Sequence, residues 1–229
     1  MKTKVFIDGS EGTTGLRINE RFQKRDDIEL LHISPDLRKD PAERKRLIHE
    51  SDITFLCLPD EAARESVALA EGENAVIIDT STAHRTKEGW AYGFPELSEA
   101  HKTAIAQGKR IAVPGCYATG FISLVYPLIA EGILQRDYPV SSFAISGYSG
   151  AGKKAIAAYG DADRPRELSS GREYALTQQH KHLACAHALI FPDHRRLLQR
   201  HGSFRTVVCG YAGKEGDAGI AAAVLCGLL

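Results

Sequence analysis

Short apolar runs alternate with segments of helical periodicity through the first half of the chain, and this alternation constrains the fold more than any other feature. The apolar runs cover residues 4–8, 28–33, 53–58 and 75–79 and lack a regular polar alternation. Strands of this kind are typical of a parallel sheet that is covered by helices on both faces. Helical patterns over residues 16–22, 41–49 and 61–71 lie between them. The sequence therefore predicts an α/β fold, a Rossmann-like doubly wound parallel sheet.

Charge and cysteine content exclude several classes of protein. The 29 basic and 29 acidic side chains of the 229 residues cancel, so no attraction to nucleic acid or to an anionic membrane is expected. No apolar run reaches about 18 residues, and the first residues lead straight into a strand, so neither a membrane span nor a signal peptide is expected. Five widely spaced cysteines without a C-x-x-C pair argue against a disulfide framework. A cytoplasmic protein is predicted.

A glycine-rich turn separates the first strand from the first helix. Its spacing is G-x-x-G-x-x-G over residues 9–15. Glycines in this context permit a tight turn and bring backbone N–H groups close to the pyrophosphate of a dinucleotide. An ordinary turn between strand and helix is the alternative. The predicted cofactor contacts in the turn are Gly9, Ser10, Gly12, Thr13, Thr14 and Gly15.

The end of the second strand indicates which dinucleotide is bound. An NAD site commonly places an acidic residue here, on the ribose 2′-hydroxyl. This chain has Ser34 at the tip and Arg38 and Lys39 just beyond it, a set that suits a 2′-phosphate. Asp36 lies in the same loop, and a solvated charged loop is the alternative. NADPH is the predicted cofactor, with Ser34, Arg38 and Lys39 among its contacts.

Two further loops are candidates for binding an anionic substrate. Residues 79–85 form a polar run after the fourth strand, and Arg85 could reach an anion there, although a capped turn is an equal alternative. A strand over residues 141–148 leads into a second glycine-rich stretch, residues 149–154, which lacks the ending of a P-loop. We expect this stretch to contact a phosphate or carboxylate. Its predicted contacts are Ser149, Gly150 and Lys153.

Cys116 stands where a strand becomes a helix. The apolar run 110–113 ends in Pro114 and Gly115, and apolar residues then recur at helical spacing to residue 129. A helix N-terminus favours a thiolate, which makes Cys116 a candidate nucleophile, whereas a small inert core cysteine is the alternative. A histidine from residues 180–182 could serve as its acid/base partner. Two histidines at this spacing do not form a convincing metal pair, and no metal site is predicted.

Together these stretches resemble N-acetyl-gamma-glutamyl-phosphate reductase, in its shorter second type. The resemblance runs from residue 1 to about Leu183 and is carried by four motifs in the same order, residues 9–15, 114–120, 146–153 and 180–182. It implies an NADP-binding domain over residues 1–115 and an α+β catalytic and dimerisation domain over residues 116–229. It also implies a homo-oligomer.

The resemblance implies reduction of an acyl phosphate in arginine biosynthesis. N-acetyl-gamma-glutamyl phosphate would become N-acetylglutamate semialdehyde, with release of phosphate, through a thioester on Cys116. His182 matches the catalytic histidine of the family, while Ser149 and Lys153 lie in a loop that faces the substrate. Two alternatives stay open, a semialdehyde dehydrogenase acting on aspartyl phosphate and a non-catalytic dinucleotide-binding remnant.

The chain departs from the family after Leu183. Residues 184–229 match nothing in it, and they concentrate histidine, cysteine and arginine. A shift of reading frame or a false stop would produce such a tail, and a divergent but genuine domain end is the alternative. The resemblance therefore implies an incomplete second domain, with an exposed sheet edge and an uncovered apolar face. Whether the chain is active is a question separate from the identity of its site.

Overall fold

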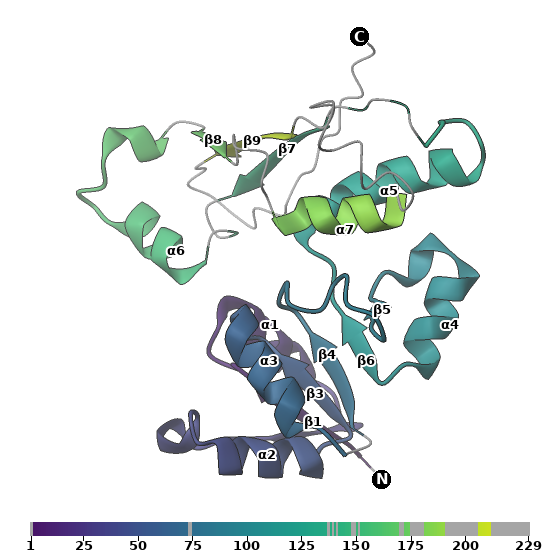
Figure 1. The fold of residues 1–229 in the computed structure, drawn as a ribbon. Helices are drawn as coiled ribbons and strands as arrows, with labels where there is room; N and C mark the ends of the chain where they lie inside the picture. The colour runs from purple at the N-terminus through teal and green to yellow at the C-terminus, as the bar shows by residue number, and fades with distance from the viewer. Residues whose placement is uncertain are drawn as a thin grey trace. The chain divides into compact units, whose positions relative to one another are not determined.

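The computed structural model describes residues 2–72, 75–136, 138, 140, 142–147, 150, 152–169, 172–174, 181–190 and 206–211. The chain divides into two compact units, Met1–Pro114 and Gly115–Leu229 (Figure 1). Each unit has its own sheet, and each is described by itself.

The first unit is a six-stranded parallel sheet in the order β2-β1-β3-β4-β6-β5. The predicted parallel α/β fold is therefore confirmed. The chain runs outward from β1 to β2 and then returns to the other side of β1 for β3, so the strand order reverses between β1 and β3. The elements are β1 (Thr3–Asp8), α1 (Thr13–Phe22), β2 (Ile28–Leu31), η1 (Pro35–Leu37), α2 (Pro41–Glu50), β3 (Ile53–Leu56), α3 (Asp60–Leu69), β4 (Val76–Asp79), β5 (Ala91–Tyr92), η2 (Pro95–Leu97), α4 (Glu99–Gln107) and β6 (Arg110–Ala112).

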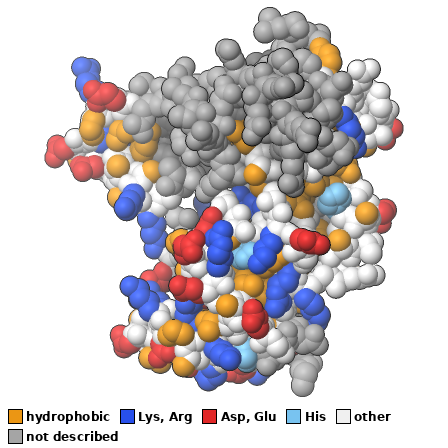
Figure 2. Space-filling view, in the orientation of Figure 1, with side chains coloured by type: hydrophobic (Ala, Val, Ile, Leu, Met, Phe, Trp, Pro, Cys, Tyr) orange, Lys and Arg blue, Asp and Glu red, His pale blue; other side chains and the backbone are white. Residues whose placement is uncertain are grey.

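Helices cover both faces of this sheet because alternate strand residues point to opposite sides. Phe6, Leu56 and Ile77 pack in one core cluster with α2 and α3. Phe55, next to Leu56, contacts Phe22 of α1, with the ring centroids 5.5 Å apart. Acidic and basic side chains are interspersed on the face of this unit that Figure 2 presents.

Local sequence signals set several helix boundaries. Asp40 caps α2 by accepting hydrogen bonds from the N–H groups of Ala42 and Glu43, and Pro41 occupies the first helical position. Ser98 caps α4 by accepting from the N–H of His101.

The second unit combines helices with a mixed three-stranded sheet in the order β7-β9-β8. Strands β7 and β9 are parallel, whereas β8 and β9 are antiparallel. The central strand β9 comes from the tail that matched no family motif. The elements are α5 (Cys116–Ala130), β7 (Ser142–Gly147), α6 (Lys153–Gly160), η4 (Arg166–Ser169), β8 (Arg172–Tyr174), α7 (Lys181–Ile190) and β9 (Thr206–Tyr211).

Candidate active site

The turn after β1 contains two glycines that the backbone packing requires. Gly9 has φ +86°, and a Cβ there would lie 2.4 Å from the carbonyl oxygen of Cys57. A Cβ on Gly15 would lie 2.4 Å from the carbonyl oxygen of Gly9. A side chain at either position would push α1 away from the end of the sheet. Glycine at both positions therefore keeps the N-terminus of α1 close to the strand ends.

The N-terminus of α1 is open to a ligand. Gly12 is its N-cap and has no side chain with which to cap the helix, and its N–H donates to the Gly9 carbonyl at 3.0 Å. Thr13 and Thr14 are exposed in the first turn, and Ser10 is half-buried beside them. An uncapped terminus presents backbone N–H groups and the positive end of the helix dipole. These residues fit the pyrophosphate of a dinucleotide.

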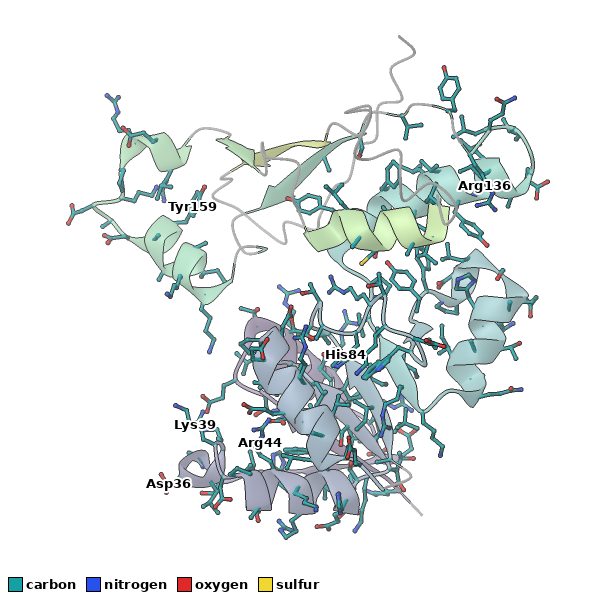
Figure 3. The ribbon with its side chains drawn as sticks, in the orientation of Figure 1. Asp36, Lys39, Arg44, His84, Arg136 and Tyr159 are labelled. Carbon is teal, nitrogen blue, oxygen red and sulfur yellow. The ribbon has the colours of Figure 1, made fainter. Side chains whose placement is uncertain are left out.

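The residues predicted to bind a 2′-phosphate lie on the connection between β2 and α2. Ser34, Arg38 and Lys39 are all exposed. Arg38 donates through Nε to a carbonyl oxygen of η1 at 3.0 Å and forms an ion pair with Glu11 of the glycine turn. Figure 3 shows Asp36 and Lys39 on the outer side of this connection. The Arg38 guanidinium thus reaches the glycine turn from the connection after β2, at the edge where the adenosine ribose lies in this fold.

A buried ion pair lies directly before the glycine turn, and the sequence reasoning missed it. Asp8 ends β1, and its Oδ2 accepts from Nε and Nη2 of Arg44, each at 3.1 Å. Ser66 of α3 donates to the same oxygen at 2.8 Å. Figure 3 shows Arg44 between α2 and the sheet. A carboxylate at the end of an apolar strand was the available signal, because such a group needs a buried partner.

The loop after β4 is organised by a second buried carboxylate. Asp79 accepts from the hydroxyl of Ser81 at 2.7 Å and lies 2.6 Å from Nδ1 of His84. The His84 ring stacks on Trp90, with centroids 4.1 Å apart. Asp79 and His84 are almost completely buried. These contacts fix the polar run 79–85 that the sequence singled out, and they give His84 a supporting role there.

Arg85 holds backbone segments together at the same edge. Its Nε donates to the carbonyl of Val113 at 2.8 Å and its Nη2 to the carbonyl of Thr80 at 3.0 Å. Its Nη1 is buried and has no hydrogen-bond partner among the described residues. Nearby, Asp60 accepts from the N–H and the hydroxyl of Thr82. Arg85 therefore supports the segment that leads to residue 116, and its contact with substrate stays a prediction.

Cys57 lies just after β3, not inside the strand as predicted, and it is half-buried. Burial raises the pKa of its thiol from 9.0 to about 11, a hydrogen bond with Thr80 acts in the opposite direction, and the charges of Asp8 and Asp79 raise it further. A thiol of this kind stays protonated near neutral pH, which makes it a poor nucleophile.

This thiol predicts an alkaline titration. In the folded protein, alkylation of Cys57 by iodoacetamide should reach half its maximal rate near pH 11, against about pH 9 in the unfolded chain. Because the folded state holds the proton to higher pH, Cys57 leaves the free energy of unfolding unchanged below pH 9 and lowers it as the pH rises toward 11. Peptide mass spectrometry measures the rate at Cys57. A midpoint near 9 in the folded protein would contradict the burial described here.

Cys116 is the first residue of α5, as the sequence predicted. Gly115 is the N-cap, and it has no side chain with which to cap the helix. The N–H and the hydroxyl of Thr119 both reach the Gly115 carbonyl, at 2.8 and 2.9 Å. Cys116 is half-buried and not in a disulfide. The thiol therefore lies at the positive end of a 15-residue helix.

His182 is the second residue of α7, and its side chain lies outside the described residues. Helix α7 packs against α5, and the two run in the same direction (Figure 1). Arg136, six residues after α5 ends, donates to the carbonyl of Ile190 at 3.0 Å, which joins the C-terminal ends. The N-termini of the two helices, with Cys116 and His182, therefore lie toward the same end of the pair.

The second glycine-rich stretch is only partly described. Lys153 is the exposed first residue of α6, after Gly152 with φ +84°. Gly150 is exposed, and Ser149 lies outside the described residues. In the part of the chain that the structure describes, no three His, Cys, Asp or Glu residues gather as a metal site. Within the same residues, no helix is long and apolar enough to span a membrane.

Two family models match the chain in succession. The NAD binding domain of semialdehyde dehydrogenases matches residues 4–105, and the dimerisation domain of the same family matches residues 116–188. The glycine turn and Arg38 fall in the first match, and Cys116, Lys153 and His182 fall in the second.

Three curated relatives at high identity carry the same name. The chain is 50% identical over 183 residues to N-acetyl-gamma-glutamyl-phosphate reductase of Chelativorans sp. strain BNC1, a match covering 80% of this chain and 58% of the relative. The match to the reductase of Burkholderia cenocepacia is 48% identical and covers 78% of this chain and 57% of the relative. The match to the reductase of Trichormus variabilis is 46% identical and covers 81% of this chain and 59% of the relative. The chain thus spans about three-fifths of the length of these relatives.

Solved structures with the same fold are aspartate semialdehyde dehydrogenases. The enzyme from Francisella tularensis aligns with a TM-score of 0.64 at 17% identity, covering 92% of this chain and 72% of that one. The enzyme from Candida albicans, solved with NADP, aligns with a TM-score of 0.61 at 12% identity, covering 93% and 68%. At this identity the likeness establishes the fold alone.

Proposed function

Because this chain belongs to the semialdehyde dehydrogenase family, we propose that it reduces N-acetyl-gamma-glutamyl phosphate to N-acetylglutamate semialdehyde with NADPH. The observation that carries the proposal is Cys116 at the start of α5, inside a match of 50% identity to a reductase of that name. An arginine-biosynthesis role follows from that substrate.

Cys116 supplies the covalent step. Its thiolate attacks the acyl carbon, the bond to the phosphate oxygen breaks, and phosphate leaves a thioester behind. A bound reduced nicotinamide supplies the hydride. The thioester that has accepted this hydride is a thiohemiacetal, still bound to Cys116. His182 gives a proton to the thiohemiacetal oxygen and takes it back as the Cys116–carbon bond breaks and the aldehyde departs. One acyl phosphate, one hydride and one proton thus give one aldehyde and one phosphate.

The remaining predicted residues bind and orient the cofactor and the substrate. The uncapped α1 terminus receives the pyrophosphate, and Ser34, Arg38 and Lys39 receive the 2′-phosphate. Lys153, at the start of α6, offers an ammonium group to the anionic substrate, with Ser149, Gly150 and Arg85 as further contacts. The dimerisation-domain match supports a homo-oligomer.

The substrate assignment has a direct test. The full chain is supplied with NADPH and either N-acetyl-gamma-glutamyl phosphate or aspartyl phosphate, and NADPH absorbance and phosphate release are followed together. We expect both signals with the first substrate only. Turnover of aspartyl phosphate alone would contradict the assignment. Tight NADPH binding to a folded chain with no turnover of either would favour the non-catalytic alternative.

A further inference from the structure

The arginine that is predicted to bind the cofactor's 2′-phosphate, Arg38, is already paired with an acidic side chain. Glu11 lies in the glycine turn and Arg38 on the connection after β2, and their side chains form an ion pair. Both are accessible, with 60% of the Glu11 and 41% of the Arg38 side chain exposed. Because Arg38 also donates to a carbonyl oxygen of η1, its guanidinium is held across the ends of β1 and β2.

We propose that Glu11 is a specificity-determining residue that competes with the cofactor's 2′-phosphate for Arg38. This inference rests on the proposed NADPH dependence and goes beyond it, because Glu11 belongs to none of the predicted contacts. The carboxylate holds the guanidinium while the site contains no phosphate. The 2′-phosphate of NADPH must displace Glu11 from Arg38, whereas NADH has no 2′-phosphate and needs no contact with Arg38.

The charges decide which partner prevails. A phosphate monoester carries a charge of about −1.5 to −2 at neutral pH and has three acceptor oxygens, whereas the carboxylate has a single charge. The phosphate therefore displaces Glu11 and accepts from Arg38. An exposed ion pair is weak, and its replacement lowers NADPH affinity by about two- to five-fold. Glu11 thus reduces the discrimination between NADPH and NADH without abolishing it.

The direct test is Glu11→Gln in the full chain, with dissociation constants measured by calorimetry for NADP⁺ and NAD⁺. We expect NADP⁺ to bind about two- to five-fold more tightly and NAD⁺ to change little. Adenosine 2′,5′-bisphosphate and adenosine 5′-monophosphate, as probes, should repeat this contrast without the nicotinamide. Glu20→Gln makes the same charge change at an exposed position later in α1 and is the matched control.

A double-mutant cycle with Arg38→Ala distinguishes competition from simple repulsion between Glu11 and the phosphate. Arg38→Ala alone should weaken NADP⁺ more than NAD⁺. If Glu11 acts by occupying Arg38, Glu11→Gln will no longer improve NADP⁺ binding in the Arg38→Ala background. An improvement that persists there, or a Glu11→Gln variant that binds NADP⁺ less tightly, would overturn the proposal.

Binding also separates this inference from the proposed function. A chain that binds NADP⁺ with unchanged affinity after Glu11→Gln would refute the role of Glu11 and leave the reductase proposal intact. If circular dichroism shows that the chain is folded and the chain has no affinity for NADP⁺, the cofactor assignment and this inference are both refuted.

Discussion

Cys116→Ser should lower phosphate release from N-acetyl-gamma-glutamyl phosphate by at least about 10³-fold, because a hydroxyl replaces the group that forms the covalent intermediate. NADP⁺ binding should change little, since the predicted dinucleotide contacts lie in residues 9–15 and 34–39. Stopped-flow phosphate detection measures the first effect and calorimetry the second. Peptide mass spectrometry of the unsubstituted chain, incubated with substrate but without NADPH, should locate an acyl group on Cys116.

Cys57→Ser is the matched control for this substitution. Its thiol has a raised pKa and lies just after β3, so its loss should leave the acylation rate nearly unchanged. Retained turnover in Cys116→Ser, or an acyl group trapped on another residue, would exclude Cys116 as the nucleophile.

Arg44→Ala should destabilise the first unit by about 3–5 kcal/mol, because it leaves the Asp8 carboxylate buried without a countercharge. The side chains of Arg44 and Asp8 are only 8% and 5% exposed. Since Asp8 directly precedes Gly9, NADP⁺ affinity should fall as well. Urea unfolding gives the free energy, and calorimetry gives the affinity.

Arg46→Ala is the control, two residues further along α2. Arg46 also pairs with two carboxylates, those of Glu43 and Glu50, but at the exposed surface. Its loss should change stability little. The double variant Asp8→Leu with Arg44→Leu should recover most of the stability lost in Arg44→Ala, since apolar side chains need no countercharge. Equal losses in Arg44→Ala and Arg46→Ala would contradict a buried pair.

Local patterns were enough to predict the first unit's architecture. Continuous apolar runs separated by helical patterns indicate strands buried on both faces, so a parallel sheet between helices was the predicted arrangement. The structure confirms that sheet, and the curated reductases together with the two family matches confirm the resemblance. Cys116 was placed at a helix start because Pro114 and Gly115 end a strand directly before a helical pattern.

Short or distant pairings could not be predicted in this way. Strand β5 has only two residues, too few to show a period, and exists because Ala91 and Tyr92 pair with β6. Strand β9 comes from a tail without a family motif and pairs with β7 and β8. Cys57 was assigned to a strand because its neighbours are apolar, whereas pairing with β4 ends at Leu56.

The sequence by itself determined the order of elements, the glycines of the first turn and the helix start at Cys116, since each depends on neighbours a few residues away. Only the tertiary structure decided which charges meet. Asp8 and Arg44 are 36 residues apart in the chain. Arg38 likewise reaches Glu11 only because the parallel pairing of β1 and β2 brings the ends of both strands to one edge. The energy of an ion pair depends on the distance between the charges and on their burial, and a local sequence pattern determines neither.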